Sequence, residues 1–507
     1  MFDKILIANR GEIAVRVMRA CREMGVKTVA VYSDVDRDAL HVRFADEAYH
    51  CGPPAAAESY LVMERILDIA KRSGADAVHP GYGFLAENGE FADLCDKSGI
   101  AFVGPSGDVM RSMGDKVTAR QTMEKAGVPI VPGTTEELSD QQAIDFAMQI
   151  GLPVMVKASA GGGGKGMRLV REEKDLEPSI ARARSEAKAS FGNDALYVEK
   201  FVEEPRHIEI QVLADTHGSV VHLFERECSI QRRHQKVIEE APGNGISDDL
   251  RQRMGAAAVA AARAVDYVGA GTCEFLVDRH GDFYFLEMNT RVQVEHPITE
   301  AITGVDIVKA MIRAAAGEPL GIEQDELTIR GHAIEARIYA EDPDNKFVPS
   351  PGHVLVYRPA GGIGVRVDSG VYQGATVTVY YDPMVAKLVT FGADREEAIE
   401  RMQRALSEFV VKGIKTSIPF HQKVVRHPIF LAGKYDTGFI DDHMAGGSGG
   451  GLETDPETRR VAFMAAAIAA YRRDKERAAR AGAAPAGGGG DPWKTFARRV
   501  GMRGGLR

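Results

Sequence analysis

The sequence has few cysteines, a single tryptophan and no long apolar run. The five cysteines show no C-x-x-C spacing, which argues against a disulfide framework or a zinc site and is typical of reduced thiols in a cytosolic protein. No apolar stretch approaches the ~20 residues of a membrane-spanning helix. The start, MFDKILIANRG, lacks the basic and apolar regions of a secretory signal. We therefore expect a cytoplasmic protein that does not act in a membrane. The cysteines are Cys21, Cys51, Cys95, Cys228 and Cys273.

Positive charge is also in deficit, because the formal net charge is −9. This balance argues against nucleic acid as a partner, although a local positive pocket remains open. A hydrophobic content of 44% and a charged content of 27% are those of a soluble globular protein. The length of 507 residues is enough for about three domains, each with its own core.

The first ~115 residues alternate between strand and helix signals but lack a G-x-G-x-x-G loop. KILIA (4–8) predicts a buried strand, a helix follows to Met24, and TVAVYS (28–33) predicts a second strand. AVHPGYG (77–83) and AFVGPS (101–106) continue the pattern, each leading into a helix. We expect an open parallel sheet that binds a ligand at the carboxyl ends of its strands, and dinucleotide binding is disfavoured.

The remainder of the chain mixes strands and helices in a less regular order. From residue 331 to 441 strand and turn signals alternate around one helix, which suggests a separate α+β unit. HMAGGSGGG (443–451) has the composition of a flexible linker. Other expected elements are helices at 114–127, 248–266, 302–317 and 395–411, a short strand at 128–133, and strands at 152–159, at 271–278 and on either side of Pro205 within 197–215.

One stretch, EMNTRVQVEHP (287–297), places polar residues at every second position. In an extended strand successive side chains point to opposite faces, so all five polar groups would share one face. A solvated edge strand can alternate in this way, but carboxylates, an amide and a fixed cation together make an unusual surface. The five residues are Glu287, Asn289, Arg291, Gln293 and Glu295.

Glu274 stands in TCEFL, on the strand expected just before this stretch. A turn at His280 and Gly281 would pair the two strands antiparallel and bring Glu274 beside Glu287 and Asn289. Three oxygen ligands together with nucleotide phosphates are what Mg²⁺ or Mn²⁺ prefers. The alternative is that these carboxylates only form a salt bridge on the face of the strand. This alternative is less favoured, because no basic residue neighbours Glu287 on that face before Arg291.

Two further stretches are candidates for anion binding. The loop GGGGKG (161–166) directly follows a strand that carries Lys157, so its backbone amides and the lysine could close on phosphate, although it is not a Walker A loop. A glycine run of this kind is otherwise often an ordinary loop. ERECSIQRRHQKVIEEAP (225–242) gathers basic and amide side chains, which are either a solvated basic turn or a site for phosphate or bicarbonate.

Together these stretches make the chain resemble the biotin carboxylase subunit of biotin-dependent carboxylases, within the ATP-grasp superfamily. The motifs lie in family order between residue 1 and about 440: ILIANRGEIAVRV, HPGYGFLAEN, GDKVTAR, KASAGGGGKGMR, EKFVEEPRHIEIQV, ERECSIQRRHQKVIEEAP, GTCEFL, FYFLEMNTRVQVEHPITE, GHAIEARIYAEDP and YDPMVAKL. The resemblance implies an N-terminal domain at 1–113, an ATP-grasp domain at 114–330 with a mobile lid at about 131–203, and a C-terminal domain at 331–442. Residues 443–507 would form a Gly-rich linker and a basic helical tail.

The resemblance also implies a role for individual residues. The nucleotide would be bound by Lys116, Lys157, Gly163, Gly164, Glu199, Lys200, Val202, His207, Gln231, His234 and Leu276, with Glu274, Glu287 and Asn289 holding Mg²⁺ or Mn²⁺. Bicarbonate would be bound by Arg291, Gln293, Val294 and Lys236. Glu295 would be the base, and Arg337 would stabilise the biotin enolate.

The activity implied is that of a ligase forming C–N bonds, which carboxylates biotin with bicarbonate and ATP through carboxyphosphate. A biotin-bearing A-M-K-M type lysine is absent, so biotin would be carried by a separate carrier protein. The further expected partners are a second copy of the chain, in a homodimer, and a carboxyltransferase subunit. Acetyl-CoA, propionyl-CoA and pyruvate systems all stay open. The alternatives are another ATP-grasp ligase, of the carboxylate–amine or carbamoyl phosphate type, and a non-catalytic ATP-binding scaffold.

The tail beyond the linker has two sequence features. One apolar face is formed at helical spacing by Val461, Met464, Ala465, Ile468 and Tyr471. Trp493 lies in a basic segment after a Gly-rich break. The tail is either a helix folded back on the body with a disordered end, or an arm that docks the carrier or the carboxyltransferase.

Overall fold

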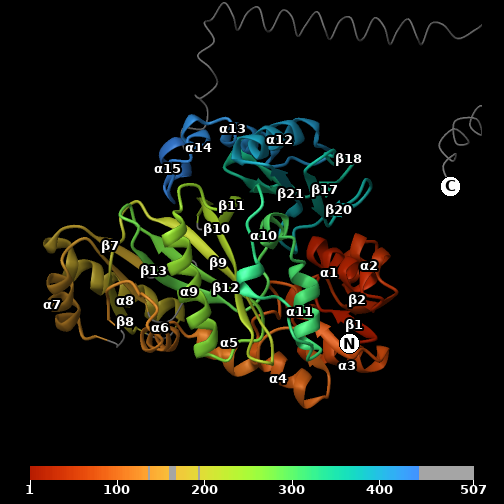
Figure 1. Ribbon diagram of the computed structural model, residues 1–507, viewed down its shortest axis with the longest axis horizontal. Coiled ribbons are helices and arrows are strands. Elements are labelled where there is room, and N and C mark those ends of the chain that lie inside the picture. The colour runs from red at the N-terminus through yellow and green to blue at the C-terminus, as the bar shows by residue number, and fades with distance from the viewer. Residues whose placement is uncertain (135–137, 159–166, 192–193, 234, 445–507) are drawn as a thin grey trace, which may run out of the picture. The chain divides into compact units, whose positions relative to one another are not determined.

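The computed structural model describes residues 1–134, 138–158, 167–191, 194–233 and 235–444 (Figure 1). The predictions for Gly163, Gly164 and His234, and for the tail from 445 onward, lie outside the described residues. No helix in the described ranges is long and apolar enough to cross a membrane.

The N-terminal part is a five-stranded parallel sheet in the order β3-β2-β1-β4-β5, which confirms the expected open sheet. Buried Ile5, Leu6 and Ile7 place β1 at its centre. The strand β3 was not singled out from the sequence, because it is an edge strand in which exposed and half-buried residues alternate. The elements are β1 (Lys4–Ile7), α1 (Gly11–Glu23), β2 (Lys27–Ser33), α2 (Leu40–Phe44), β3 (Glu47–Gly52), α3 (Met63–Ser73), β4 (Ala77–His79), α4 (Gly89–Lys97), β5 (Ala101–Phe102), α5 (Gly107–Gly114) and α6 (Lys116–Lys125).

A small three-stranded antiparallel sheet follows, in the order β7-β6-β8. Two helices pack on it through small residues such as Ala143 and Ala147, which let them approach Val154 and Val156 closely. This layer lies at the left of Figure 1. Its elements are α7 (Asp140–Ile150), β6 (Val154–Ala158), β7 (Met167–Val170), α8 (Leu176–Phe191) and β8 (Leu196–Lys200). The strand expected at 128–133 is instead two isolated bridges, Ile130 to Phe285 and Gly133 to Glu199.

The largest element is an eight-stranded antiparallel sheet in the order β13-β12-β9-β10-β11-β14-β21-β19. It crosses the boundary expected at 330/331, because β14 pairs with β11. The strands are β9 (Arg206–Ala214), β10 (Val220–Arg232), β11 (Gln235–Ala241), β12 (Gly269–Val277), β13 (Phe283–Asn289), β14 (His332–Tyr339), β19 (Val365–Ser369) and β21 (Met384–Gly392). Residues 225–232 and 235–241, from the stretch considered as either a basic turn or an anion site, lie on β10 and β11 and are largely buried.

Helices cover this sheet. α9 (Asp248–Ala264) packs on β9, β10 and β12, and α12 (Arg395–Glu408) packs on β14 and β21 (Figure 1). The single helix expected at 302–317 is two, α10 (His296–Thr303) and α11 (Ile307–Ala315), because Gly304 adopts φ 76° and Asp306 caps the second helix. The C-terminal part also contains short strands β15 (Glu341–Asp342), β16 (Val348–Pro349), β17 (Gly352–His353), β18 (Val356–Arg358), β20 (Thr376–Val377) and β22 (Val410–Lys412), with helices α13 (Ile418–Val424), α14 (Pro428–Leu431) and α15 (Phe439–His443).

Candidate active site

A cavity of about 1460 Å³ lies between the N-terminal part, the small sheet and the large sheet. It collects most of the residues predicted from the sequence. Its lining includes Lys116, Lys157, Glu199, Lys200, Val202, His207, Gln231, Lys236, Glu274, Leu276, Glu287, Asn289, Arg291, Gln293, Val294 and Arg337. Glu295 does not line the cavity; its side chain is fully buried just behind the wall.

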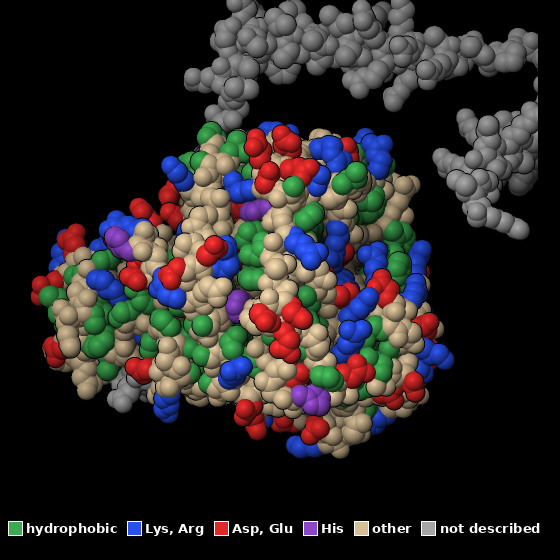
Figure 2. Space-filling model, in the orientation of Figure 1, with side chains coloured by type: hydrophobic (Ala, Val, Ile, Leu, Met, Phe, Trp, Pro, Cys, Tyr) green, Lys and Arg blue, Asp and Glu red, His purple; other side chains and the backbone are tan. Residues whose placement is uncertain are grey.

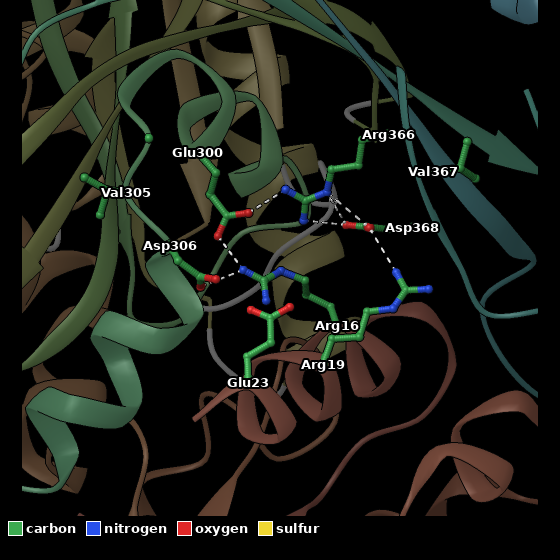
Figure 3. A pocket seen from close by; sticks show the side chains of 10 residues that line it. Arg16, Arg19, Glu23, Glu300, Val305, Asp306, Arg366, Val367 and Asp368 are labelled. Atoms are coloured by element: carbon green, nitrogen blue, oxygen red, sulfur yellow. Dashed lines mark hydrogen bonds and ion pairs between the residues drawn. The ribbon is translucent and has the colours of Figure 1, made fainter. Parts of the chain in front are cut away.

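A second cavity, of about 330 Å³, is lined by charged residues of α1, α10 and β19 (Figure 3). The Arg16 guanidinium lies between Glu300 and Asp306, at 2.8 and 2.7 Å. Arg366 pairs with Glu300 at 2.7 Å and with Asp368 at 2.8 Å. These pairs tie α10 to α1 and β19, and none of the residues predicted for the site lines this cavity. The face of the molecule in Figure 2 likewise mixes both signs of charge.

The ammonium group of Lys236, near the start of β11, lies in the wall of the large cavity. Its Nζ lies 2.5 Å from Glu209 Oε2, 2.7 Å from Glu274 Oε1 and 2.9 Å from Glu295 Oε1. Burial disfavours the charged ammonium, but the three carboxylates outweigh it and raise the pKa of Lys236 well above its ordinary value. Lys236 is therefore a cation held in place by three carboxylates.

Glu295 joins this cluster to a second cation. Its Oε2 accepts a hydrogen bond from Arg337 Nη2 at 2.9 Å, and Arg337 Nε in turn donates to Glu239 Oε1 at 2.6 Å. Burial acts to raise the pKa of Glu295, but Lys236 and Arg337 together hold it well below its usual range. Burial also raises the pKa of Glu239 to about 7, against the pull of Arg337. The result is a chain of alternating basic and acidic groups from Lys236 through Glu295 and Arg337 to Glu239.

The residues 287–295 approach each other in a different way from that predicted. β13 ends at Asn289 and the chain then turns, because Glu295 is the residue before α10 and Pro297 lies in the first turn of that helix. The five residues therefore do not share one strand face. Arg291 connects them instead, donating to Asn289 Oδ1 and to Gln293 Oε1, both at 2.9 Å.

The pairing of β12 with β13 places Glu274 directly opposite Glu287, as the sequence predicted. The Glu274 carboxylate accepts hydrogen bonds from Asn289 at 2.9 Å and Gln293 at 3.0 Å, and lies 2.8 Å from His207 Nε2. Within the described ranges, Glu287 has no hydrogen bond or ion pair. Burial and repulsion from Glu274 raise the pKa of Glu287. A carboxylate that has no direct partner in the described ranges, paired in register with a second one, fits a hard divalent cation such as Mg²⁺ or Mn²⁺.

A second cluster in the lining of the cavity surrounds Glu199, on β8. Lys157 of β6 and Arg120 of α6 both pair with its carboxylate. Burial and repulsion from Lys157 lower the pKa of Lys116. The ammonium group of Lys200 does not pair with Glu199. Its Nζ instead donates to the carbonyls of Gly151 at 2.8 Å and Leu152 at 3.1 Å.

Sequence reasoning missed two residues of the site, Glu209 and Glu239. It considered Arg226, in the stretch 225–242, for anion binding and not for the ion pair that it forms. Arg226 is fully buried behind Glu209 and pairs with it. Its Nη1 also donates to Gln211 Oε1 at 2.7 Å, and these contacts orient the carboxylate that contacts Lys236. The signal for Glu209 was present in HIEIQV, where polar and apolar residues alternate along β9.

Three family models match successive parts of the chain. The N-terminal domain of biotin carboxylase matches residues 1–110, the ATP-binding domain of the carbamoyl-phosphate synthase L chain matches 115–323, and the C-terminal domain of biotin carboxylase matches 335–442. Among curated proteins, a pyruvate carboxylase subunit of Methanothermobacter thermautotrophicus is 57% identical over 462 residues, which cover 91% of this chain and 92% of the relative. Biotin carboxylase 1 of Bacillus subtilis is 53% identical over 450 residues, covering 88% of this chain and 100% of the relative.

Solved structures agree with this match. A biotin carboxylase–β-γ-ATP complex from Campylobacter jejuni aligns with a TM-score of 0.84 and 47% identity, covering 87% of this chain and 99% of the other. The biotin carboxylase domain dimer of the Hydrogenobacter thermophilus 2-oxoglutarate carboxylase, in complex with MgADP, ADP and bicarbonate, aligns with a TM-score of 0.82 and 48% identity, covering 88% and 98%. With this fold and this degree of identity over most of its length, the chain belongs to the biotin carboxylase family.

Proposed function

We propose that the chain carboxylates biotin with bicarbonate at the expense of ATP, as a ligase forming C–N bonds. The observation that carries this proposal is the charge chain Lys236–Glu295–Arg337, which begins beside the facing carboxylates Glu274 and Glu287. It provides a base between two cations, next to a place for a metal–nucleotide complex. The deprotonation of bicarbonate requires such a base, and the transfer of a phosphoryl group to it requires such cations and a bound metal–nucleotide complex.

The nucleotide would occupy the cavity between the two sheets. Lys116 and Lys157 would bind its phosphates, which requires Lys157 to leave Glu199. Glu274, Glu287 and Asn289 would hold Mg²⁺ or Mn²⁺, which supplies charge compensation for phosphoryl transfer when it is bound. The remaining nucleotide-binding residues would be Glu199, Lys200, Val202, His207, Gln231 and Leu276, together with the predicted Gly163, Gly164 and His234.

Bicarbonate would bind beside Lys236, between Arg291, Gln293 and the backbone of Val294. The low pKa of Glu295 is set by Lys236 and Arg337, so Glu295 becomes a stronger base when these cations turn to the anionic substrate. Glu295 would take the bicarbonate proton, and the deprotonated bicarbonate would attack the γ-phosphoryl group of ATP, forming carboxyphosphate and releasing ADP. A site shielded from water by the lid predicted at about 131–203 protects this reactive product from hydrolysis.

Carboxyphosphate would break down to CO₂ and phosphate beside biotin. The released phosphate takes the N1 proton of biotin, and Arg337 stabilises the resulting enolate by its charge. N1 then attacks CO₂ to form carboxybiotin. This second role of Arg337 agrees with its position, since it lines the cavity while still contacting Glu295.

Partners follow from the same chemistry. We propose that biotin arrives on a separate carrier protein and that a carboxyltransferase subunit consumes the product, in an acyl-CoA or pyruvate carboxylase. A homodimer is supported by the dimer named for the Hydrogenobacter thermophilus domain. All five cysteines are free and buried, as expected of a protein from a reducing compartment, and we propose the cytoplasm.

The nearest alternative is a carbamoyl phosphate type ligase, since the family model matched by residues 115–323 carries that name. The effect of biotin on ATP cleavage distinguishes a biotin carboxylase from a carbamoyl phosphate type ligase. The purified chain should release phosphate from MgATP and bicarbonate faster when free biotin or a biotinylated carrier domain is added. Stimulation by ammonium instead of biotin would support the alternative. No ATP cleavage with either would leave only the non-catalytic scaffold.

A further inference from the structure

Lys387, on β21, belongs to the motif YDPMVAKL, to which the chemistry above gives no role. Its side chain is fully buried, a position that lysine rarely occupies unless its ammonium group is paired. The Nζ donates a hydrogen bond to the main-chain carbonyl of Val294 at 2.8 Å and lies 3.2 Å from Glu12 Oε2. One ammonium group thus joins the C-terminal part, the turn before α10 and the helix α1.

The carbonyl that Lys387 holds lies between two groups of the site. Gln293, on one side, donates to Glu274, and Glu295, on the other, pairs with Lys236 and Arg337. Arg337 is also the direct partner of Lys387 in the register of β14 and β21. The same strand pair therefore carries one cation that holds the carboxylate of Glu295 and another that holds the backbone beside it.

Glu12 is itself held firmly. The hydroxyl group of Tyr82, which lines the large cavity, donates to Glu12 Oε1. Gly370 packs so closely that a Cβ there would lie 2.8 Å from the backbone nitrogen of Glu12. The counter-ion of Lys387 thus has little freedom to move, and the ammonium group is fixed with it.

A purely stabilising ion pair does not account for this arrangement. Burying both charges costs about as much as their attraction returns, so a buried pair is weak evidence for stability. The hydrogen bond to Val294 adds a directional contact to the backbone of the turn proposed to bind bicarbonate. This hydrogen bond fixes the position of the Val294 carbonyl, which the ion pair with Glu12 alone would not do.

We propose that Lys387 is a positioning residue, which fixes the Val294 carbonyl and with it the positions of Gln293 and Glu295 on either side, with Glu12 as its counter-ion. The inference rests on the proposed function, because it concerns the turn that would bind bicarbonate. Lys387 does not itself line the large cavity. Its effect should therefore appear in the use of bicarbonate and not in the binding of ATP.

The test is Lys387→Met, which keeps the length of the side chain and removes the donor. We expect kcat/KM for bicarbonate to fall tenfold or more, because small misplacements of reacting groups cost at least this much, while KM for ATP stays within twofold. Lys4→Met is the matched control. Lys4 also pairs with one carboxylate, Glu47, and one carbonyl, that of Ser73, both at 2.7 Å, but it lies on β1 and does not line the cavity. Its kinetics should match those of the parent.

The double variant Lys387→Met/Glu12→Gln separates positioning from stability. It removes the carboxylate that the single change leaves unpaired, so its Tm should recover towards that of the parent while the bicarbonate defect persists. Recovery of both would make Lys387 a structural residue and overturn the proposal, as would unchanged bicarbonate kinetics in a folded Lys387→Met. If the parent shows no biotin-dependent ATP cleavage, the proposed function fails instead.

Discussion

Replacing Glu295 by Gln removes the proposed base while keeping the shape of the side chain. The fully buried carboxylate has two charged partners, Lys236 and Arg337, each at 2.9 Å. Neither cation is left alone by the change. Lys236 keeps Glu209 and Glu274, and Arg337 keeps Glu239.

The magnitude follows from these remaining partners. Removing one member of a buried ion pair costs about 3–5 kcal/mol when the other charge is left uncompensated. Because both cations retain a carboxylate, we expect a loss of only about 1.5–3 kcal/mol in the free energy of unfolding, the range for hydrogen bonds to charged groups. Catalysis should suffer more. Loss of a general base lowers turnover by ~10²-fold or more, which is about 3 kcal/mol in the barrier.

The assay is phosphate release from ATP with bicarbonate and free biotin, combined with calorimetric binding of ADP and a urea unfolding curve. Glu295→Gln should bind ADP as the parent does and fail in turnover. Glu408→Gln is the control, because Glu408 forms an exposed pair with Arg404 at 2.9 Å on α12. Turnover within threefold of the parent would refute the role of Glu295, and a parallel loss of ADP binding would show that the variant damages the whole site.

Three more predictions concern the metal, pH and the tail. Glu287→Gln should raise the Mg²⁺ concentration needed for half-maximal activity and lower turnover, because one charged ligand is lost; an unchanged metal dependence would remove Glu287 from the site. Glu239 has a pKa raised to about 7, so the folded state binds its proton more tightly than the unfolded state and this residue lowers stability as pH rises from about 4.5 to 7. Unfolding free energies across that range should thus fall less steeply for Glu239→Gln, and an equal slope would contradict the assignment. A chain ending at Gly451 should still cleave ATP with free biotin but fail to capture carrier or carboxyltransferase subunits, and capture equal to that of the full chain would leave the tail without a docking role.

The elements that the sequence predicts well are those defined by local patterns. The buried run before Asn9 gives β1, and the Gly-containing turn at 280–281 gives the β12–β13 hairpin that places Glu274 opposite Glu287. Both follow from side-chain periodicity and turn chemistry within a short segment. The family resemblance then named residues that line one cavity.

The contacts that the sequence predicts poorly are those that depend on the order of strands in the sheet. Glu209 and Arg226 meet because β9 lies beside β10, and Glu239 reaches Arg337 because β11 lies beside β14. No local pattern encodes which strands are neighbours. The turn after Asn289 was missed because alternation of polar residues continues through it, although Pro297 at the start of a helix already indicated that the strand could not continue.

The pairing of β11 with β14 has a consequence for dividing the chain. A fragment ending near residue 330 would expose the β11 edge as unpaired amides and carbonyls, and such an edge invites association with other chains. The fragment would also lack Arg337 and Lys387 while retaining every proposed metal ligand. If the C-terminal piece were supplied separately, it could dock by adding its strand to that edge. A split enzyme of this kind would couple reassembly directly to activity, since one strand pairing restores both the sheet and the cations around Glu295.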